Sequence, residues 1–209
     1  MRPPQICALC LESSELQRSH ILPDAVFRRL KQQTSGKMIE MRDGQGGPIR
    51  YSQESWWEYL LCKGCEGILR NYETYGFQLL RGARHVQSRR HNQGITFENH
   101  DYKKFKLFLM SLIWRMGVSQ QPQFSKVIVP TPFLEELRAR LHVGTEFGPL
   151  RFGVIIQRLR DSTSSEDGGL SLETLKQLIM SPVPRLYGKR GYYACLLYTS
   201  PSPRDLSTS

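Results

Sequence analysis

The sequence of 209 residues lacks a long apolar run. The stretch that comes closest, Phe105 to Met116, is too short to span a bilayer and contains Lys106 and Arg115. The sequence also lacks an N-terminal apolar segment of the kind that directs secretion, and it has no internal repeat. These absences predict a protein of the reducing cytoplasm that has no membrane partner.

Cysteine is scarce, with five residues in the chain, and one of them, Cys195, opens an unusual C-terminal segment. One reading frame of a common transposase-adapter DNA encodes residues 195 to 205 in order. We therefore interpret residues 195–209 as a translated sequencing adapter and expect the native chain to be interrupted near Ala194. A disordered tail rich in serine and proline is the alternative that composition allows.

The other four cysteines form two Cys-x-x-Cys pairs, Cys7-Ala-Leu-Cys10 and Cys62-Lys-Gly-Cys65. Two such pairs complete a tetrahedral four-cysteine site for a structural Zn²⁺. A pair of disulfides is the alternative, which a reducing compartment disfavours. Zinc would join the two ends of the intervening segment, and His20 would then lie inside the loop that the ion closes.

Acidic residues are outnumbered: 19 Asp and Glu stand against 29 Lys and Arg, which gives a net charge of +10. The basic residues are clustered, and this pattern suits a polyanion such as nucleic acid, with DNA favoured over RNA. A solvated basic face without a partner is the alternative. The arginines expected to contact phosphates are Arg28, Arg29, Arg81, Arg84, Arg89 and Arg90.

The apolar pattern predicts an α+β fold in two parts. Residues 1–83 are expected to form a compact unit of the zinc-ribbon or ββα-metal type, and residues 101–194 a mostly helical α/β region that the adapter leaves incomplete. Residues 84–100 are polar, basic and without a clear period, so we expect a linker or a loop lying on nucleic acid. Strands are predicted around Cys7 and at 37–41, 56–62 and 152–156, and helices from Pro23, over 65–80, over 102–116 with a stop at Gly117, from an N-cap at Thr131, and over 171–180.

The segment Ser19-His20-Ile-Leu-Pro23, placed between two zinc-binding pairs, resembles the HNH endonuclease superfamily over roughly residues 5 to 80. The resemblance implies a ββα-metal fold in which a histidine activates water and a divalent cation, Mg²⁺ or Mn²⁺, stabilises the scissile phosphate. His20 would be the general base. Most of the native chain also resembles a group of bacterial HNH-like proteins, through residues 58–66, 71–75 and 105–115, but this likeness brings no established reaction with it.

Two positions depart from the superfamily pattern. Ser19 stands where an aspartate usually ligates the catalytic cation, and Glu66 follows the second cysteine pair where Asn or His is usual. Glu66 and Glu73 are seven residues apart on one face of the predicted helix, so we expect them to supply carboxylate ligands instead. The alternatives are a structural His20 bonded to a backbone carbonyl, and glutamates that favour a helix N-terminus or pair with Arg70 and Lys63 on a solvated surface.

Two functions therefore stay open at this point. One is a metal-dependent endonuclease that hydrolyses phosphodiesters. The other is a zinc-stabilised module that binds nucleic acid or another partner and has lost the chemistry. Trp56, Trp57 and Tyr59 are candidates for base stacking, although we expect burial in a strand for at least one tryptophan.

Overall fold

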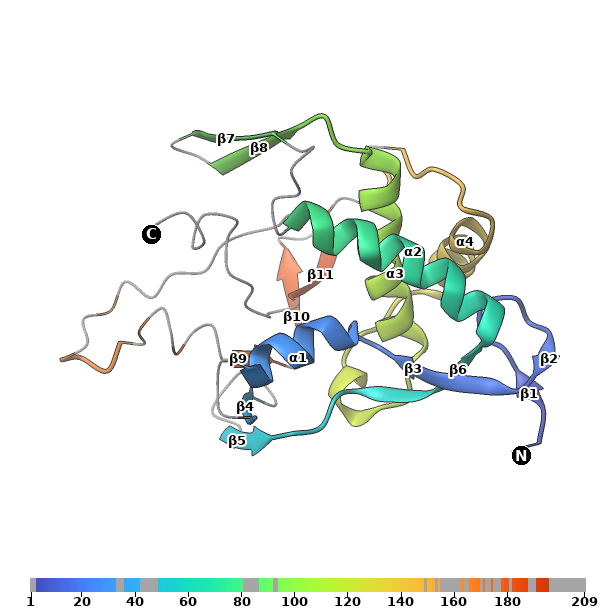
Figure 1. Cartoon of the computed structure of the whole chain (residues 1–209), viewed down its shortest axis with the longest axis horizontal. Coiled ribbons are helices and arrows are strands. Elements are labelled where there is room, and N and C mark those ends of the chain that lie inside the picture. The colour runs from blue at the N-terminus through green and yellow to red at the C-terminus, as the bar shows by residue number, and fades with distance from the viewer. Residues whose placement is uncertain are drawn as a thin grey trace.

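The computed structural model describes residues 3–32, 36–41, 49–80, 87–91, 94–148 and 150–152, with shorter stretches between 154 and 195. It confirms the mixed α+β class (Figure 1). The helices are α1 (Asp24–Gln32), α2 (Lys63–Leu80), α3 (Tyr102–Val118) and α4 (Thr131–Val143). The strands are β1 (Gln5–Ile6), β2 (Ser13–Ser14), β3 (Leu16–His20), β4 (Met38–Met41), β5 (Ile49–Ser52), β6 (Trp57–Cys62), β7 (Gln87–His91), β8 (Gly94–Glu98), β9 (Leu178–Met180), β10 (Val183–Tyr187) and β11 (Gly191–Cys195).

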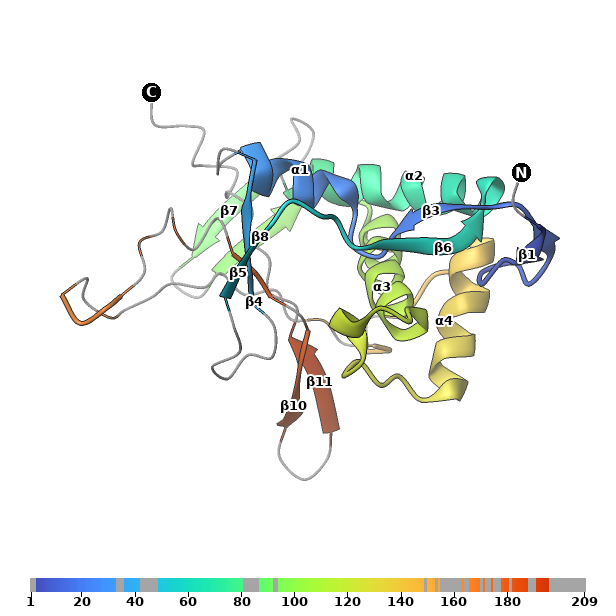
Figure 2. The same ribbon diagram turned by 90° about the horizontal axis from the view of Figure 1, so that it is seen from below.

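An antiparallel ribbon of β3 and β6 lies next to α2, which begins directly after β6 (Figures 1 and 2). The register pairs His20 with Trp57 and Ser19 with Glu58, and it shifts between Gln17 and Arg18. The short β1–β2 hairpin precedes the ribbon and carries the first cysteine pair in its turn. The ribbon and α2 match the strand and helix that the apolar pattern predicts at 56–62 and 65–80.

Helices α2 and α3 pack closely because a glycine faces an aromatic ring. A Cβ built on Gly76 would lie 2.2 Å from a ring carbon of Phe108, a distance that no real side chain tolerates. Phe77 lies beside the same ring, with the two ring centroids 5.5 Å apart. Gly76 therefore permits the contact between α2 and α3 while α2 continues unbroken to Leu80.

One apolar core joins residues from both expected parts of the chain. It contains Cys7, Leu61 and Leu69 from the first part together with Trp114 and Leu141 from the second, all of them at most 3% exposed. The boundaries at residues 83 and 100 stay a prediction. The basic segment between them departs from the expected irregular loop, since β7 and β8 form a hairpin. Backbone pairing and an ion pair between Arg89 and Glu98 support this hairpin, in which β7 is polar throughout and β8 has only Ile95 and Phe97 as alternating apolar residues.

Three helix boundaries differ from the sequence prediction. Helix α3 runs through Gly117, where a Cβ would meet Leu134 at 2.9 Å, so this glycine allows packing and does not stop the helix. Helix α4 has Pro130 as its N-cap, with no side-chain capping bond from Thr131. Residues 178–180 form β9 parallel to β4 instead of a helix end, because a short buried apolar run is equally compatible with a strand.

Other expectations fall on residues that the structure does not describe. Among them are most of the strand expected at 152–156 and the segment 196–209. The start expected for the last helix does carry a capping bond, in which the Thr174 amide donates to Ser171 Oγ at 3.0 Å. Among the described residues, no helix combines the length and apolar character that crossing a bilayer requires.

Candidate metal centre and the adjacent histidine

The fold gathers the four predicted cysteines at one point. Cys7 and Cys10 belong to the turn between β1 and β2, Cys62 ends β6, and Cys65 lies in the first turn of α2. Their sulfur atoms all lie within 4.8 Å of one another. The predicted cluster of four cysteines is therefore confirmed, and it can hold a metal ion such as zinc.

The spacing and surroundings of the sulfurs suit a tetrahedral ion. Zn–S bonds of about 2.3 Å imply sulfur separations of about 3.8 Å, and the Sγ atoms of Cys10 and Cys62 are 4.0 Å apart. The Cys62 amide donates to Cys7 Sγ at 3.3 Å, and the Cys65 amide donates to Cys62 Sγ at 3.5 Å. All four are free thiols, so the disulfide alternative is not realised. Amide donors and the N-terminus of α2 both favour thiolates here.

The four cysteines need a bound cation before all of them can be deprotonated thiolates. Burial raises the pKa of Cys65, and the neighbouring side chains of Cys62 and Cys7 raise it further. Burial also raises the pKa of Cys10. At Cys7 burial acts in the same direction, but backbone hydrogen bonds near Cys10, Cys62 and Leu9 outweigh it, and the net pKa is lowered. A bound dication would neutralise the thiolates and displace their protons, which makes the donor set fit zinc.

His20 ends β3 and keeps part of its side chain accessible, with 28% exposed. Its Nε2 lies 3.1 Å from Ser55 Oγ and 3.5 Å from Asp24 Oδ1. Within the described part of the chain, Nδ1 has no hydrogen-bond partner. Sequence reasoning missed Asp24, although its position four residues after His20 at the start of α1 is a readable signal.

Burial lowers the pKa of His20 below its ordinary value of about 6.5. The negative charges of Asp24, Glu66 and Glu73 oppose this shift, and the positive charge of Arg18 adds to it. The net shift is downward, so the imidazole is neutral at pH 7 and can accept a proton.

Ser19 does not share the surroundings of His20. It is fully buried, and its Oγ accepts a hydrogen bond from the Leu61 amide at 3.1 Å. Successive residues of a strand point to opposite faces, so Ser19 and His20 lie on different sides of the ribbon. The position that carries an aspartate in the superfamily pattern therefore has a structural role here.

Glu73 forms an ion pair that the sequence did not reveal. Its Oε1 lies 2.5 Å from Nη1 of Arg115, a residue of α3 whose side chain is 2% exposed. The same Nη1 donates to the backbone carbonyl of His20 at 3.0 Å. Arg115 thus ties the end of β3 to α2, and the partner of Glu73 is a buried arginine instead of a surface one.

The charges of Glu66 and Glu73 act on His20, but these carboxylates form no close ligand group with it in the described part of the chain. Within the described residues, the group of three or more possible ligand atoms that lie close together is the four cysteine sulfurs, all within 4.8 Å of one another. Glu73 is engaged by Arg115, and Glu66 has one buried carboxylate oxygen without a hydrogen-bond partner in the described part of the chain. A catalytic cation held by Glu66 and Glu73 stays a prediction.

Two of the arginines expected to bind phosphate form exposed ion pairs. Arg28 pairs with Asp24 at 3.0 Å, and Arg89 pairs with Glu98 at 3.2 Å. Both guanidinium groups keep more than two thirds of their side-chain surface exposed. Arg81 and Arg84 lie outside the described residues, and so do the side chains of Arg29 and Arg90. Phosphate contact by these arginines stays a prediction.

The aromatic residues before and within β6 divide between core and surface. Trp56 is 2% exposed and packs edge-on between Phe27 and Phe124, so one tryptophan is buried as expected, although it lies just before β6 and not within a strand. Trp57 is only partly buried, and the guanidinium of Arg18 lies 3.7 Å from its ring centroid.

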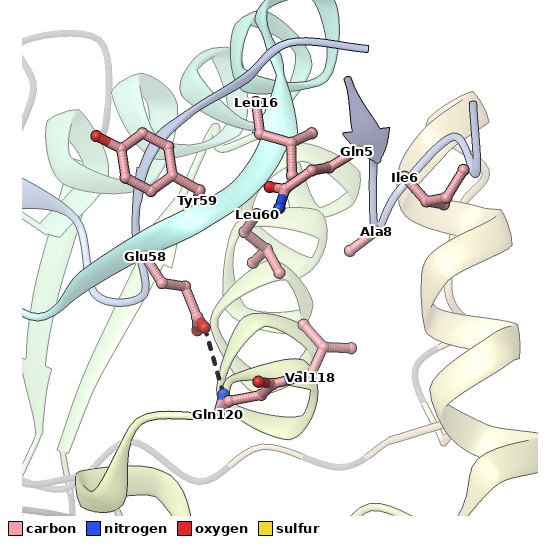
Figure 3. A pocket seen from close by; sticks show the side chains of 9 residues that line it. All are labelled: Gln5, Ile6, Ala8, Leu16, Glu58, Tyr59, Leu60, Val118 and Gln120. Carbon is pink, nitrogen blue, oxygen red and sulfur yellow. Dashed lines mark hydrogen bonds between the residues drawn. The ribbon is translucent and has the colours of Figure 1, made fainter. Parts of the chain in front are cut away.

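A cavity of about 420 Å³ lies beside β6 and the end of α3. Figure 3 shows Glu58 and Leu60 pointing to one side of β6 and Tyr59 to the other. Glu58 accepts a hydrogen bond from the Gln120 amide at 3.4 Å. Because Glu58 is the cross-strand partner of Ser19, it lies on the face of the ribbon away from His20.

Comparison with known protein families, with curated proteins and with solved structures found no match to this chain. The likeness to HNH endonucleases therefore rests on the motif residues alone and stays a prediction.

Proposed function

We propose that this chain binds nucleic acid and hydrolyses its phosphodiester bonds, with His20 as the general base. The observation that carries the proposal is the state of His20: a partly exposed imidazole with a lowered pKa, held at Nε2 by Ser55 and Asp24. A neutral histidine oriented by a carboxylate is the usual arrangement for removing a proton from water.

The proton transfer would take place at Nδ1. When Nε2 keeps its proton and donates it toward Asp24 or Ser55, the lone pair of the neutral ring is at Nδ1. Water next to Nδ1 would lose a proton to the ring as its oxygen attacks phosphorus, and the carboxylate of Asp24 would stabilise the imidazolium that forms. The bond from phosphorus to the leaving sugar oxygen would break in the same displacement, and that oxygen would take a proton from solvent water. Arg115 would act as a positioning residue, because its bond to the His20 carbonyl holds the end of β3.

Zinc has a structural part in this proposal. When bound by the four cysteines, it would supply a closed tetrahedral link and no open coordination position for water. The link joins the β1–β2 turn to the start of α2, at the opposite end of β3 from His20. The ion would therefore fix the ribbon against α2 without contacting the reacting groups.

A specific observation favours the second candidate, a zinc-stabilised binding module without chemistry. Ser19, which stands where the superfamily pattern has an aspartate ligand, is buried on the other face of the ribbon, and Glu73, an expected cation ligand, is paired with Arg115. Under this reading His20 would hold Asp24 and Ser55 in place and transfer no proton.

Cleavage assays with the full chain separate the two candidates. Supercoiled DNA, single-stranded DNA and RNA would be incubated with the zinc-loaded protein, with and without added Mg²⁺ or Mn²⁺. We expect His20→Ala to lower the cleavage rate about 100-fold or more and to leave binding unchanged. His142→Ala, on α4, is the matched control and should retain full activity. Binding without cleavage by the wild type, on every substrate, would establish the binding module instead.

A further inference from the structure

The ribbon carries a mixed aromatic and basic surface next to His20. The register places Arg18 opposite Tyr59 and His20 opposite Trp57. Because strand side chains alternate, these four residues lie on one face, away from the buried Ser19. We call Arg18, Trp57 and Tyr59 the ribbon surface.

The ribbon surface combines stacking area with a positive charge. The guanidinium of Arg18 lies 3.7 Å from the centroid of the Trp57 ring, and Tyr59 meets that ring edge-on at 5.5 Å. Arg18 is exposed, and Trp57 is partly exposed. Trp56 and Trp114 are 2% and 0% exposed, so Trp57 is the one tryptophan of the three with ring area at the surface.

We propose that the ribbon surface binds an unpaired nucleobase, so that the preferred ligand is a single strand. This inference rests on the proposed nucleic-acid function. The base takes the face of the Trp57 ring that Arg18 now covers, and the long Arg18 side chain turns outward to an adjacent phosphate. A base within a duplex has both faces stacked and cannot reach the ring.

The same geometry places the bound strand beside the proposed base. His20 is the cross-strand neighbour of Trp57, so a strand anchored at Trp57 brings its next phosphates past the imidazole. The net charge of +10 attracts the backbone of any nucleic acid, but it does not distinguish bases from phosphates. Trp57 supplies that distinction.

The test compares two strands that share phosphates and differ in bases. A short oligo-dT strand and an abasic strand of equal length would be titrated into the full zinc-loaded chain without added Mg²⁺ or Mn²⁺. Fluorescence anisotropy of a dye at the 5′ end of each strand would measure binding, because this signal does not depend on Trp57 and can be read in every variant. We expect the wild type to bind oligo-dT about 10-fold more tightly than the abasic strand.

Substitutions then assign the two contributions. Trp57→Ala should remove the preference for bases and keep the salt dependence, whereas Trp57→Phe, which keeps a ring, should retain most of the preference. Arg18→Ala should keep the preference and reduce the slope of log K against log salt by about 0.7, as expected for one lost phosphate contact on a single strand. Tyr51→Ala is the matched control, because Tyr51 is an aromatic residue of β5 that is 74% exposed.

The outcomes separate the failure of this inference from that of the proposed function. Equal binding of the two strands by the wild type, or a base preference that survives Trp57→Ala, would overturn the ribbon surface as a base-binding site. Binding of neither strand would overturn both the inference and the nucleic-acid function. A base preference together with cleavage that does not depend on His20 would support the ribbon surface and remove only the catalytic assignment.

Discussion

The contact between α2 and α3 can be tested with two glycines of the same helix. Gly76 faces the ring of Phe108, which is fully buried, whereas Gly67 is exposed and would have no atom within 4 Å of an added Cβ. Gly67→Ala and Gly76→Ala therefore make the same chemical change in α2, one in open space and one against a ring. Because Glu73 and Arg115 bridge these two helices, the contact also positions the end of β3.

The expected magnitudes follow from two opposing effects. Alanine is favoured over glycine inside a helix by about 1 kcal/mol, and this gain applies at both positions. At Gly76 the added Cβ would lie 2.2 Å from a Phe108 ring carbon, so the ring or the helix must move. Forcing extra volume into a packed core costs about 1–3 kcal/mol, and so short a contact with a buried ring belongs at the upper end. We expect Gly67→Ala to stabilise by about 1 kcal/mol and Gly76→Ala to destabilise by about 2 kcal/mol.

Urea unfolding of the zinc-loaded chain, monitored by circular dichroism, measures both free energies of unfolding. In a thermal scan each kcal/mol corresponds to a shift in Tm of about 2–4 °C for a chain of this size. Phe108→Leu in the Gly76→Ala background should recover part of the loss, because the two positions interact directly. If Gly76→Ala is as stable as Gly67→Ala, the close approach of α2 and α3 at this point is wrong.

Two further predictions concern the metal and the histidine. Chelation of zinc should lower the Tm of the wild type, because the free energy of zinc binding contributes to the free energy of folding. The same treatment should leave the Tm of the Cys65→Ser variant unchanged. An unchanged Tm in the wild type would contradict the zinc centre. The lowered pKa of His20 means that the unfolded chain binds more protons near pH 6, so the free energy of unfolding should fall as pH decreases below about 6.5. In His20→Gln the free energy of unfolding should depend less on pH between about pH 5 and 8. An equal pH dependence in the wild type and the variant would show that the pKa of His20 is not lowered.

Local sequence patterns were sufficient for several elements. The Cys-x-x-Cys spacing identified all four members of the cluster, and apolar periodicity located α2 and α3. Both predictions were correct because cysteine spacing involves only a few neighbouring residues and the apolar residues of a helix repeat with the helical period. The β7–β8 hairpin escaped this reasoning because β7 is polar throughout and β8 offers only Ile95 and Phe97 as an apolar pattern. Strand β9 escaped it because its partner strand β4 lies far away in sequence.

The candidate site shows the same division. His20 could be selected from its motif, and its position between the two cysteine pairs predicted that it would lie within the loop closed by the metal. The buried bond from Arg115 to Glu73 and to the His20 carbonyl could not be read in advance, because it depends on how α3 crosses the ribbon. Nor could the sequence tell which of Trp56 and Trp57 enters the core.

The sequence by itself determined which residues can form the metal centre, because thiolate chemistry and ligand spacing are local properties. It also determined the basic character of the chain. Only the tertiary structure decided that Ser19 is buried while His20 keeps access to water, and that Glu73 is neutralised by Arg115. The physical reason is that strand register and helix packing set the partner of each side chain, and these depend on contacts between residues far apart in the chain.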